Sequence, residues 1–241
     1  MIRFVTGTDT EVGKTVVSAA LARRGRLAGR RVAYFKPVQT GVDAQEVGDA
    51  EFVAEVASVP VYEGLRVRPP LAPAVAAEME GVEIEPERLV ARALELAAGV
   101  DELVVEGAGG VLVEMARGYP MAEFARVLAG ASMASSSTSG FGVVIATRPD
   151  LGTLNHTALS VEALRRRGIE VEGLVISGWP ADPTPTHRSN REELARIAPL
   201  LGFVRLCAGL DTQTVPGDLA GLGSRPPVAW SAESLEIVRD W

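Results

Sequence analysis

One short segment near the N-terminus constrains the fold more than any other feature of the sequence. Residues 7–15 read GTDTEVGKT, after an apolar run at residues 2–6 and before a stretch rich in Ala, Val and Leu at residues 14–28. A glycine-containing loop that ends in Gly-Lys-Thr between a buried strand and a helix is typical of phosphate binding. The sequence therefore predicts a strand, a phosphate-binding loop and a helix in that order.

The residue types in this loop match the chemistry of a bound phosphate. Lys14 can neutralise the charge of β- and γ-phosphates, and the hydroxyl of Thr15 can ligate Mg²⁺. Backbone N–H groups and the helix N-terminus supply further donors. Five residues, instead of the usual four, separate Gly7 from Gly13, so Thr8 stands where the first glycine is expected.

The rest of the chain alternates between short apolar runs and helical patterns. Strands are expected at residues 32–36, 102–106, 143–147 and 171–177, and helices from Pro86, at 154–167, and from a capping box of Ser189 and Glu192 to about residue 198. Strands that are apolar on both faces indicate an α/β fold with one doubly wound, mostly parallel sheet and helices on both faces. Residues 131–140 and 211–227 have no apolar period and are expected to be loops. Since no linker or repeat is visible, residues 1–241 are expected to form a single domain.

Composition excludes several classes of function. A net charge of −7 without clustered lysines argues against nucleic acid as a partner, and the run of arginines at residues 165–167 is expected to be a solvated helix end. No apolar run approaches the roughly 18 residues of a membrane span. The single cysteine, Cys207, cannot form an internal disulfide, and no signal peptide is visible. We therefore expect a cytoplasmic protein.

Lysine is nearly absent, because 22 of the 24 basic residues are Arg. The two lysines are Lys14 and Lys36, and the second begins the segment KPVQTG at residues 36–41, expected at the carboxyl end of a strand. Ligands of open parallel sheets collect beyond the carboxyl ends of strands. We therefore expect Lys36 to approach the same phosphate as Lys14. A compact ammonium acts there as a point charge, which a planar guanidinium cannot replace.

Two carboxylates are candidates for a metal site. Glu106 is expected to close a strand just before the glycine-rich segment GAGG at residues 107–110. A carboxylate at a strand end can hold Mg²⁺ directly or through water, and glycines let the backbone approach a ligand or form a tight turn. Asp49 is either a further ligand or a helix cap.

Together these segments resemble the dethiobiotin synthetase family, whose fold is of the P-loop NTPase type. The resemblance rests on TGTDTEVGKT, KPVQTG, VEGAGG and LGTLNH, at residues 6–15, 36–41, 105–110 and 151–156. It implies an ATP- and Mg²⁺-dependent ligase of biotin biosynthesis. In that family 7,8-diaminononanoate reacts with CO₂ to a carbamate, ATP phosphorylates the carbamate, and the second amine closes the ring of dethiobiotin with release of ADP and phosphate.

The resemblance also implies roles for individual residues. Lys36, Lys14 and Thr10 would be catalytic, with the lysines stabilising charge on the γ-phosphate and the carbamate. Thr10, Lys36 and Thr40 would contact the substrate, and Asn155 would bind its distant carboxylate from the partner subunit of a homodimer. Thr15, Asp49 and Glu106 would hold Mg²⁺. The residues contacting the nucleotide would be Glu11, Val12, Gly13, Lys14, Thr15, Val16, Asp49, Glu106, Gly107, Ala108, Gly109, Ser177 and Gly178.

The sequence departs from the family at several places, which include Arg205 where a proline is expected and a longer loop at residues 131–140, and it leaves an alternative open. Some members carry an Asn-Asp pair that reads adenine, where this chain has Ser177 and Gly178, so the preferred nucleoside triphosphate is open. The main alternative is a partner-regulated P-loop ATPase switch of the partitioning type. Such switches usually carry an additional lysine early in the loop, and here none precedes Lys14. A glutamine-dependent relative such as cobyrinate diamide synthase would need a further domain with a reactive Cys and His.

Overall fold

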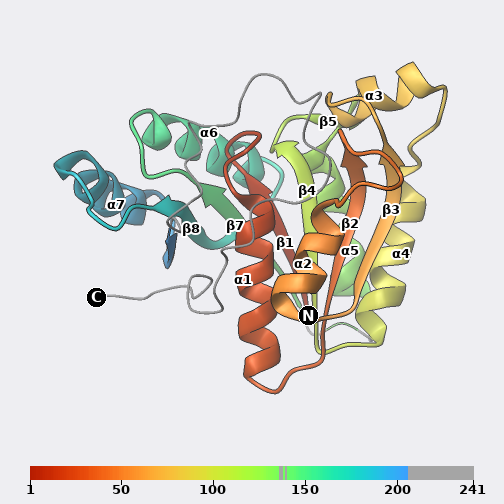
Figure 1. The fold of residues 1–241 in the computed structure, drawn as a ribbon, viewed down its shortest axis with the longest axis horizontal. Helices are drawn as coiled ribbons and strands as arrows, with labels where there is room; N and C mark the ends of the chain where they lie inside the picture. The colour runs from red at the N-terminus through yellow and green to blue at the C-terminus, as the bar shows by residue number, and fades with distance from the viewer. Residues whose placement is uncertain (136–137, 139, 206–241) are drawn as a thin grey trace.

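The computed structural model describes residues 1–135, 138 and 140–205, and in this part of the chain seven parallel strands form one sheet. A small antiparallel hairpin stands beside it (Figure 1). The elements in chain order are β1 (Ile2–Gly7), α1 (Lys14–Leu27), β2 (Val32–Thr40), α2 (Asp49–Ala57), β3 (Val61–Val67), α3 (Pro73–Glu80), α4 (Pro86–Ala98), β4 (Glu102–Gly110), β5 (Glu114–Ala116), β6 (Tyr119–Pro120), α5 (Met121–Ala134), β7 (Phe141–Thr147), α6 (Thr153–Arg165), β8 (Val171–Trp179), α7 (Pro185–Ile197) and β9 (Leu200–Arg205).

β1 is the central strand of the sheet, and the later strands are added on both of its sides. The order is β3-β2-β4-β1-β7-β8-β9, so β2 and β3 lie on one side of β1 and β7 to β9 on the other. On β1, Val5 pairs with Glu106 of β4 and with Val144 of β7. A crevice at the carboxyl ends of the strands is expected at such a switch point. The predicted phosphate loop begins there, directly after β1.

Helices cover both faces of the sheet, which confirms the predicted α/β architecture. On one face, β-branched side chains from five strands pack under α1 and α2: Val5, Val104, Val144, Val175 and Val204. Figure 1 shows these two helices in front of the sheet. On the other face a second cluster, with Phe4 against Phe124, lies beneath α4, α5, α6 and α7. Because both faces are buried, every residue of β1 is shielded from solvent.

Two strands are longer than expected, which corrects the predicted position of Lys36. β2 pairs with β4 only as far as Phe35 and Val105, and then continues beside β3 to Thr40. We did not anticipate β3, whose backbone groups satisfy those of β2 beyond Pro37. Lys36 therefore lies inside its strand and not at its end. Likewise Glu106 does not close β4, since that strand continues to Gly110.

Two expectations about helix ends were also wrong. α7 begins at Pro185 after the cap Thr184, whose hydroxyl accepts a hydrogen bond from the backbone of His187, so the box of Ser189 and Glu192 lies inside the helix. Proline at the first helical position favours this earlier start. α5 extends to Ala134 and so includes the first part of the expected loop at residues 131–140. Residues 211–227 and Cys207 lie outside the described part of the chain. Among the described helices, none has the length and apolar character needed to cross a membrane.

Candidate active site

The predicted phosphate loop joins β1 directly to α1. Gly13 has a φ of 82°, and α1 begins at the next residue. A side chain at Gly13 would collide with the Ser177 hydroxyl of β8, so only glycine fits. Glu11, with a φ of 57°, also has a left-handed backbone, which is uncommon for a residue with a side chain. Strain of this kind is concentrated at functional sites.

Lys14 folds back over this loop. Its Nζ donates a hydrogen bond to the backbone oxygen of Asp9 at 2.9 Å, and the residue is only 7% exposed. Burial lowers the pKa of Lys14 to about 8, with Glu106 opposing the shift and the positive charge of Lys36 adding to it. The two lysines of the chain are therefore close enough to repel one another, around one shared carboxylate.

Lys36 is the buried centre of an ion-pair cluster. Its Nζ lies 2.6 Å from Asp49 Oδ2 and 2.7 Å from Glu106 Oε1, and also contacts the backbone oxygen of Gly107 at 3.3 Å. Burial by itself lowers the pKa of Lys36, but Glu106 and Asp49 outweigh it and raise the pKa above its ordinary value. Lys36 thus remains protonated at neutral pH.

Glu106 accepts hydrogen bonds on both carboxylate oxygens. Oε1 accepts from Thr15 Oγ1 at 2.9 Å as well as from Lys36, and Oε2 accepts from the Tyr34 hydroxyl at 2.9 Å. These partners come from α1 and from two positions of β2. The carboxylate is 1% exposed, so three neighbours determine its orientation.

Asp49 lies across Lys36 from Glu106. It is the first residue of α2, and Gly48 takes the cap position that the alternative interpretation had assigned to it. Its backbone N–H donates to Gln39 Oε1 at 3.0 Å. Burial would raise the pKa of the Asp49 carboxyl, but Lys36 and the Thr15 hydroxyl lower it below its usual value. Asp49 is therefore an ionised carboxylate.

The chemistry of these donors fits a magnesium ion. Thr15, Asp49 and Glu106 offer one hydroxyl and two carboxylates, the hard oxygen ligands that Mg²⁺ prefers. Within the described ranges, no group of three or more His, Cys, Asp or Glu residues could hold a metal by itself. Mg²⁺ usually takes one or two carboxylates and completes its shell with water and phosphate oxygens, so two carboxylates suffice.

The other predicted residues are distributed along the carboxyl edge of the sheet. Thr10 is exposed on the loop, Thr40 ends β2, and Asn155 is exposed in the first turn of α6. Val12 is buried and Val16 half-buried, and their side chains pack in the cluster under α1. The last predicted positions lie in the final residues of β4 and β8: Gly107, Ala108, Gly109 and Gly178.

Three neighbours of the site were missed from the sequence. Tyr34 contacts Glu106, Gln39 contacts the backbone of Asp49, and Arg148 Nη2 donates to the backbone oxygen of Thr10 at 2.9 Å. A signal existed for Tyr34, since residues two apart on a strand share a face and Tyr34 precedes Lys36 by two. Arg148 directly follows a strand, where ligands collect.

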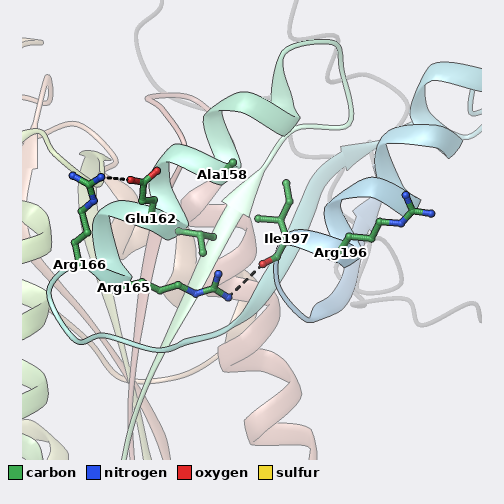
Figure 2. Close-up of a pocket in the computed structure, with 7 residues that line it drawn as sticks. Ala158, Glu162, Arg165, Arg166, Arg196 and Ile197 are labelled. Carbon is green, nitrogen blue, oxygen red and sulfur yellow. Dashed lines mark hydrogen bonds and ion pairs between the residues drawn. The ribbon is translucent and has the colours of Figure 1, made fainter.

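A pocket of about 510 Å³ lies between α6 and α7, away from the phosphate loop (Figure 2). Arg165 donates to the backbone oxygen of Ile197 at 3.4 Å, and Arg166 pairs with Glu162 at 2.5 Å. Its arginines are thus occupied with the protein itself. None of the residues that line it belongs to the predicted site; they are Ala158, Val161, Glu162, Arg165, Arg166, Arg196 and Ile197.

Comparisons with known proteins agree with this geometry. Residues 3–212 match the family described as AAA domain. The chain is 40% identical over 241 residues to the ATP-dependent dethiobiotin synthetase BioD of Streptomyces coelicolor, covering 97% of each chain. The chain belongs to the dethiobiotin synthetase family. A second member, from Mycobacterium leprae, is 41% identical over 98% of this chain and 95% of its own.

Solved structures support the fold of this family member. Chloroplast FtsY from Physcomitrella patens matches with a TM-score of 0.53 at 17% identity, covering 86% of this chain and 59% of its own. FtsY from Elizabethkingia anophelis matches similarly, with a TM-score of 0.53 at 16% identity, over 84% of this chain and 58% of its own. At this identity the likeness shows the fold alone. The family inferred from the four motifs and the predicted α/β fold are both confirmed.

Proposed function

We propose that this protein is a dethiobiotin synthetase that converts 7,8-diaminononanoate, CO₂ and a nucleoside triphosphate, ATP in its relatives, to dethiobiotin, ADP and phosphate. The observation that carries the proposal is the 40% identity to a dethiobiotin synthetase over 97% of both chains. The cluster of the buried Lys36 and Glu106 with the half-buried Asp49 beside the predicted phosphate loop supports it. We place the reaction in the cytoplasm.

The reaction needs two displacements at one site. One amine of the substrate adds to CO₂ and loses a proton, which gives a carbamate. The carbamate oxygen then attacks the γ-phosphorus, so that the bond to the β-phosphate oxygen breaks and ADP leaves. The second amine attacks the carbonyl carbon of the resulting carbamic-phosphoric anhydride. Phosphate leaves, and the cyclic urea of dethiobiotin is formed.

The two lysines supply the positive charge that phosphoryl transfer requires. Lys14 exchanges its hydrogen bond to the Asp9 backbone for phosphate oxygens when the nucleotide binds. Lys36 is already protonated and is held in place by Asp49 and Glu106. Its ammonium therefore has to move little when charge develops on the phosphate during the transfer. Thr10 and Thr40 contact the diamine or its carbamate on the same side of the site.

Thr15, Asp49 and Glu106 are the residues that would hold Mg²⁺. When bound, the ion neutralises charge on the phosphate oxygens. The nucleotide lies along the backbone of the loop, from Glu11 to Val16. Its remaining contacts come from the ends of two strands, at Gly107, Ala108, Gly109, Ser177 and Gly178.

Asn155 completes the substrate site from a second subunit in this proposal. Its amide is exposed at the start of α6, where it is free to reach the distant carboxylate of a substrate bound to the partner. The active assembly is then a homodimer, with each chain acting as a single domain.

Phosphate release and product formation test the proposal together. The purified chain with ATP and Mg²⁺ should release phosphate only when both diamine and bicarbonate are present, with dethiobiotin detected by mass spectrometry in equal amount. A partner-regulated ATPase switch would instead release phosphate without either compound when its partner or a membrane is added. Release that ignores both diamine and bicarbonate would refute the synthetase assignment.

A further inference from the structure

A buried tyrosine contacts the carboxylate at the centre of the site. Tyr34 is 0% exposed, and its hydroxyl donates to Glu106 Oε2 at 2.9 Å. Its ring packs in the apolar cluster under α1, among side chains such as Val5 and Val104. The hydroxyl is thus the one polar atom of a side chain that is otherwise part of the core.

The register of the sheet explains how this contact arises. Tyr34 and Lys36 are two residues apart on β2, so both side chains point to the same face. Tyr34 pairs with Val104 on β4, which places Glu106 two residues further along the neighbouring strand on that face. Tyr34 contacts Glu106 Oε2 from the apolar cluster under α1, whereas Lys36 contacts Glu106 Oε1.

The two oxygens of Glu106 therefore have different surroundings. Oε1 accepts from Thr15 and Lys36, whereas Oε2 accepts from Tyr34. Burial raises the pKa of the Tyr34 hydroxyl well above its ordinary value, and the negative charge of Glu106 raises it further. In the structure this hydroxyl donates to Oε2, so that oxygen of the carboxylate lies on the side of the core.

We propose that Tyr34 is a positioning residue, whose hydroxyl holds Glu106 so that Oε1 faces Thr15 and the nucleotide. Thr15 and Lys36 both bind Oε1, so without the Tyr34 hydroxyl none of the described contacts holds Oε2, and the carboxylate turns more easily about its Cγ–Cδ bond. Groups that orient a metal-binding carboxylate in this way typically contribute 10–100-fold to metal affinity. Tyr34 then determines how tightly the site binds a Mg²⁺–nucleotide complex. This inference rests on the proposed function only for the identity of that ligand.

Tyr34→Phe tests the proposal by removing one oxygen and keeping the ring. Calorimetric titration with ADP, in the presence and absence of Mg²⁺, measures binding without turnover. We expect the variant to bind Mg²⁺–ADP at least about 10-fold more weakly than wild type, with binding of ADP alone unchanged. In the synthetase assay, the Mg²⁺ concentration for half-maximal rate should rise by the same factor, while kcat at saturating Mg²⁺ changes little.

Tyr119→Phe is a matched control, because the Tyr119 hydroxyl is buried and has no hydrogen-bond partner among the described residues. It should leave both titrations unchanged. Mg²⁺ dependence within about twofold of wild type in a folded Tyr34→Phe protein would overturn the proposal and leave Tyr34 a packing residue. If wild type binds Mg²⁺–ADP but forms no dethiobiotin, the proposed function fails while the role of Tyr34 is still decided by the titrations.

Discussion

Replacing Lys36 by arginine is the sharpest test of the site, because it keeps the charge and changes only its shape. The ammonium of Lys36 uses its three donors on Asp49, Glu106 and the backbone of Gly107, at 2.6, 2.7 and 3.3 Å. Arginine carries a larger planar group with five donors. The site is buried, so the guanidinium has to displace one of these partners.

The expected magnitudes separate stability from catalysis. Enlarging a packed side chain costs about 1–3 kcal/mol in the free energy of unfolding. Loss of a positioned electrostatic group lowers turnover by about 100–1,000-fold, which corresponds to about 2.7–4 kcal/mol in the activation free energy. Lys36→Met removes the charge itself, so turnover should fall at least as far, and the loss of both ion pairs to Asp49 and Glu106 should destabilise the fold by about 3–5 kcal/mol.

The measurement is the initial rate of dethiobiotin formation at saturating ATP, Mg²⁺, diamine and bicarbonate, with urea unfolding of the same samples. Arg196→Lys is the control, since the Arg196 side chain is 76% exposed, pairs with Glu193 on the surface and should be exchangeable without effect. A Lys36→Arg protein that turns over at the wild-type rate would refute the catalytic role of Lys36. Only a lysine on the surface, in contact with water, tolerates replacement by arginine without loss.

Three further changes test other parts of the structure. ATP should bind more weakly as pH rises through about 8, where Lys14 loses its proton. Above that pH, calorimetry should detect the uptake of a proton when ATP binds. Lys14→Arg should remove this pH dependence of the affinity. Gly13→Ala should cost about 1–3 kcal/mol of stability and abolish ATP binding measured by titration, with partial recovery on adding Ser177→Gly. Arg3→Met should lower the urea midpoint, by less than the roughly 3–5 kcal/mol of a fully unpaired buried charge, because Arg3 pairs with the buried Glu102 while Arg30 still compensates that carboxylate. The KM for ATP should not change in that variant, since Arg3 lies at the start of β1 and the loop follows the end of that strand.

The sequence predicted the structure well wherever the prediction depends only on residues close together in the chain. The order of residues in the loop at 7–15 predicts strand, loop and helix together, since each part needs only its neighbours in the chain. The apolar runs predicted β1, β7 and β8 to within two residues at either end. Their burial on both faces was evident as well, because a strand with no polar side is characteristic of a covered parallel sheet.

Pairing between distant strands was not predictable in this way. The unexpected strand β3 lengthens β2 beyond Pro37, and no local pattern reveals that Lys36 lies inside a strand. The early start of α7 depends on the cap Thr184 and on Pro185, and this cap competes with the capping box that begins five residues later at Ser189.

By itself, then, the sequence determined the α/β class and the family, and it predicted the phosphate loop and the two lysines of the candidate site. Only the tertiary structure decided what surrounds those lysines. Lys36 meets Asp49 and Glu106, and Glu106 meets Tyr34, because β2 and β4 lie side by side in one register and α2 begins next to them. Local residue patterns reflect backbone preference and burial, which act over a few positions. The orientation of a buried carboxylate depends on which strand becomes its neighbour, and that is a property of the whole sheet.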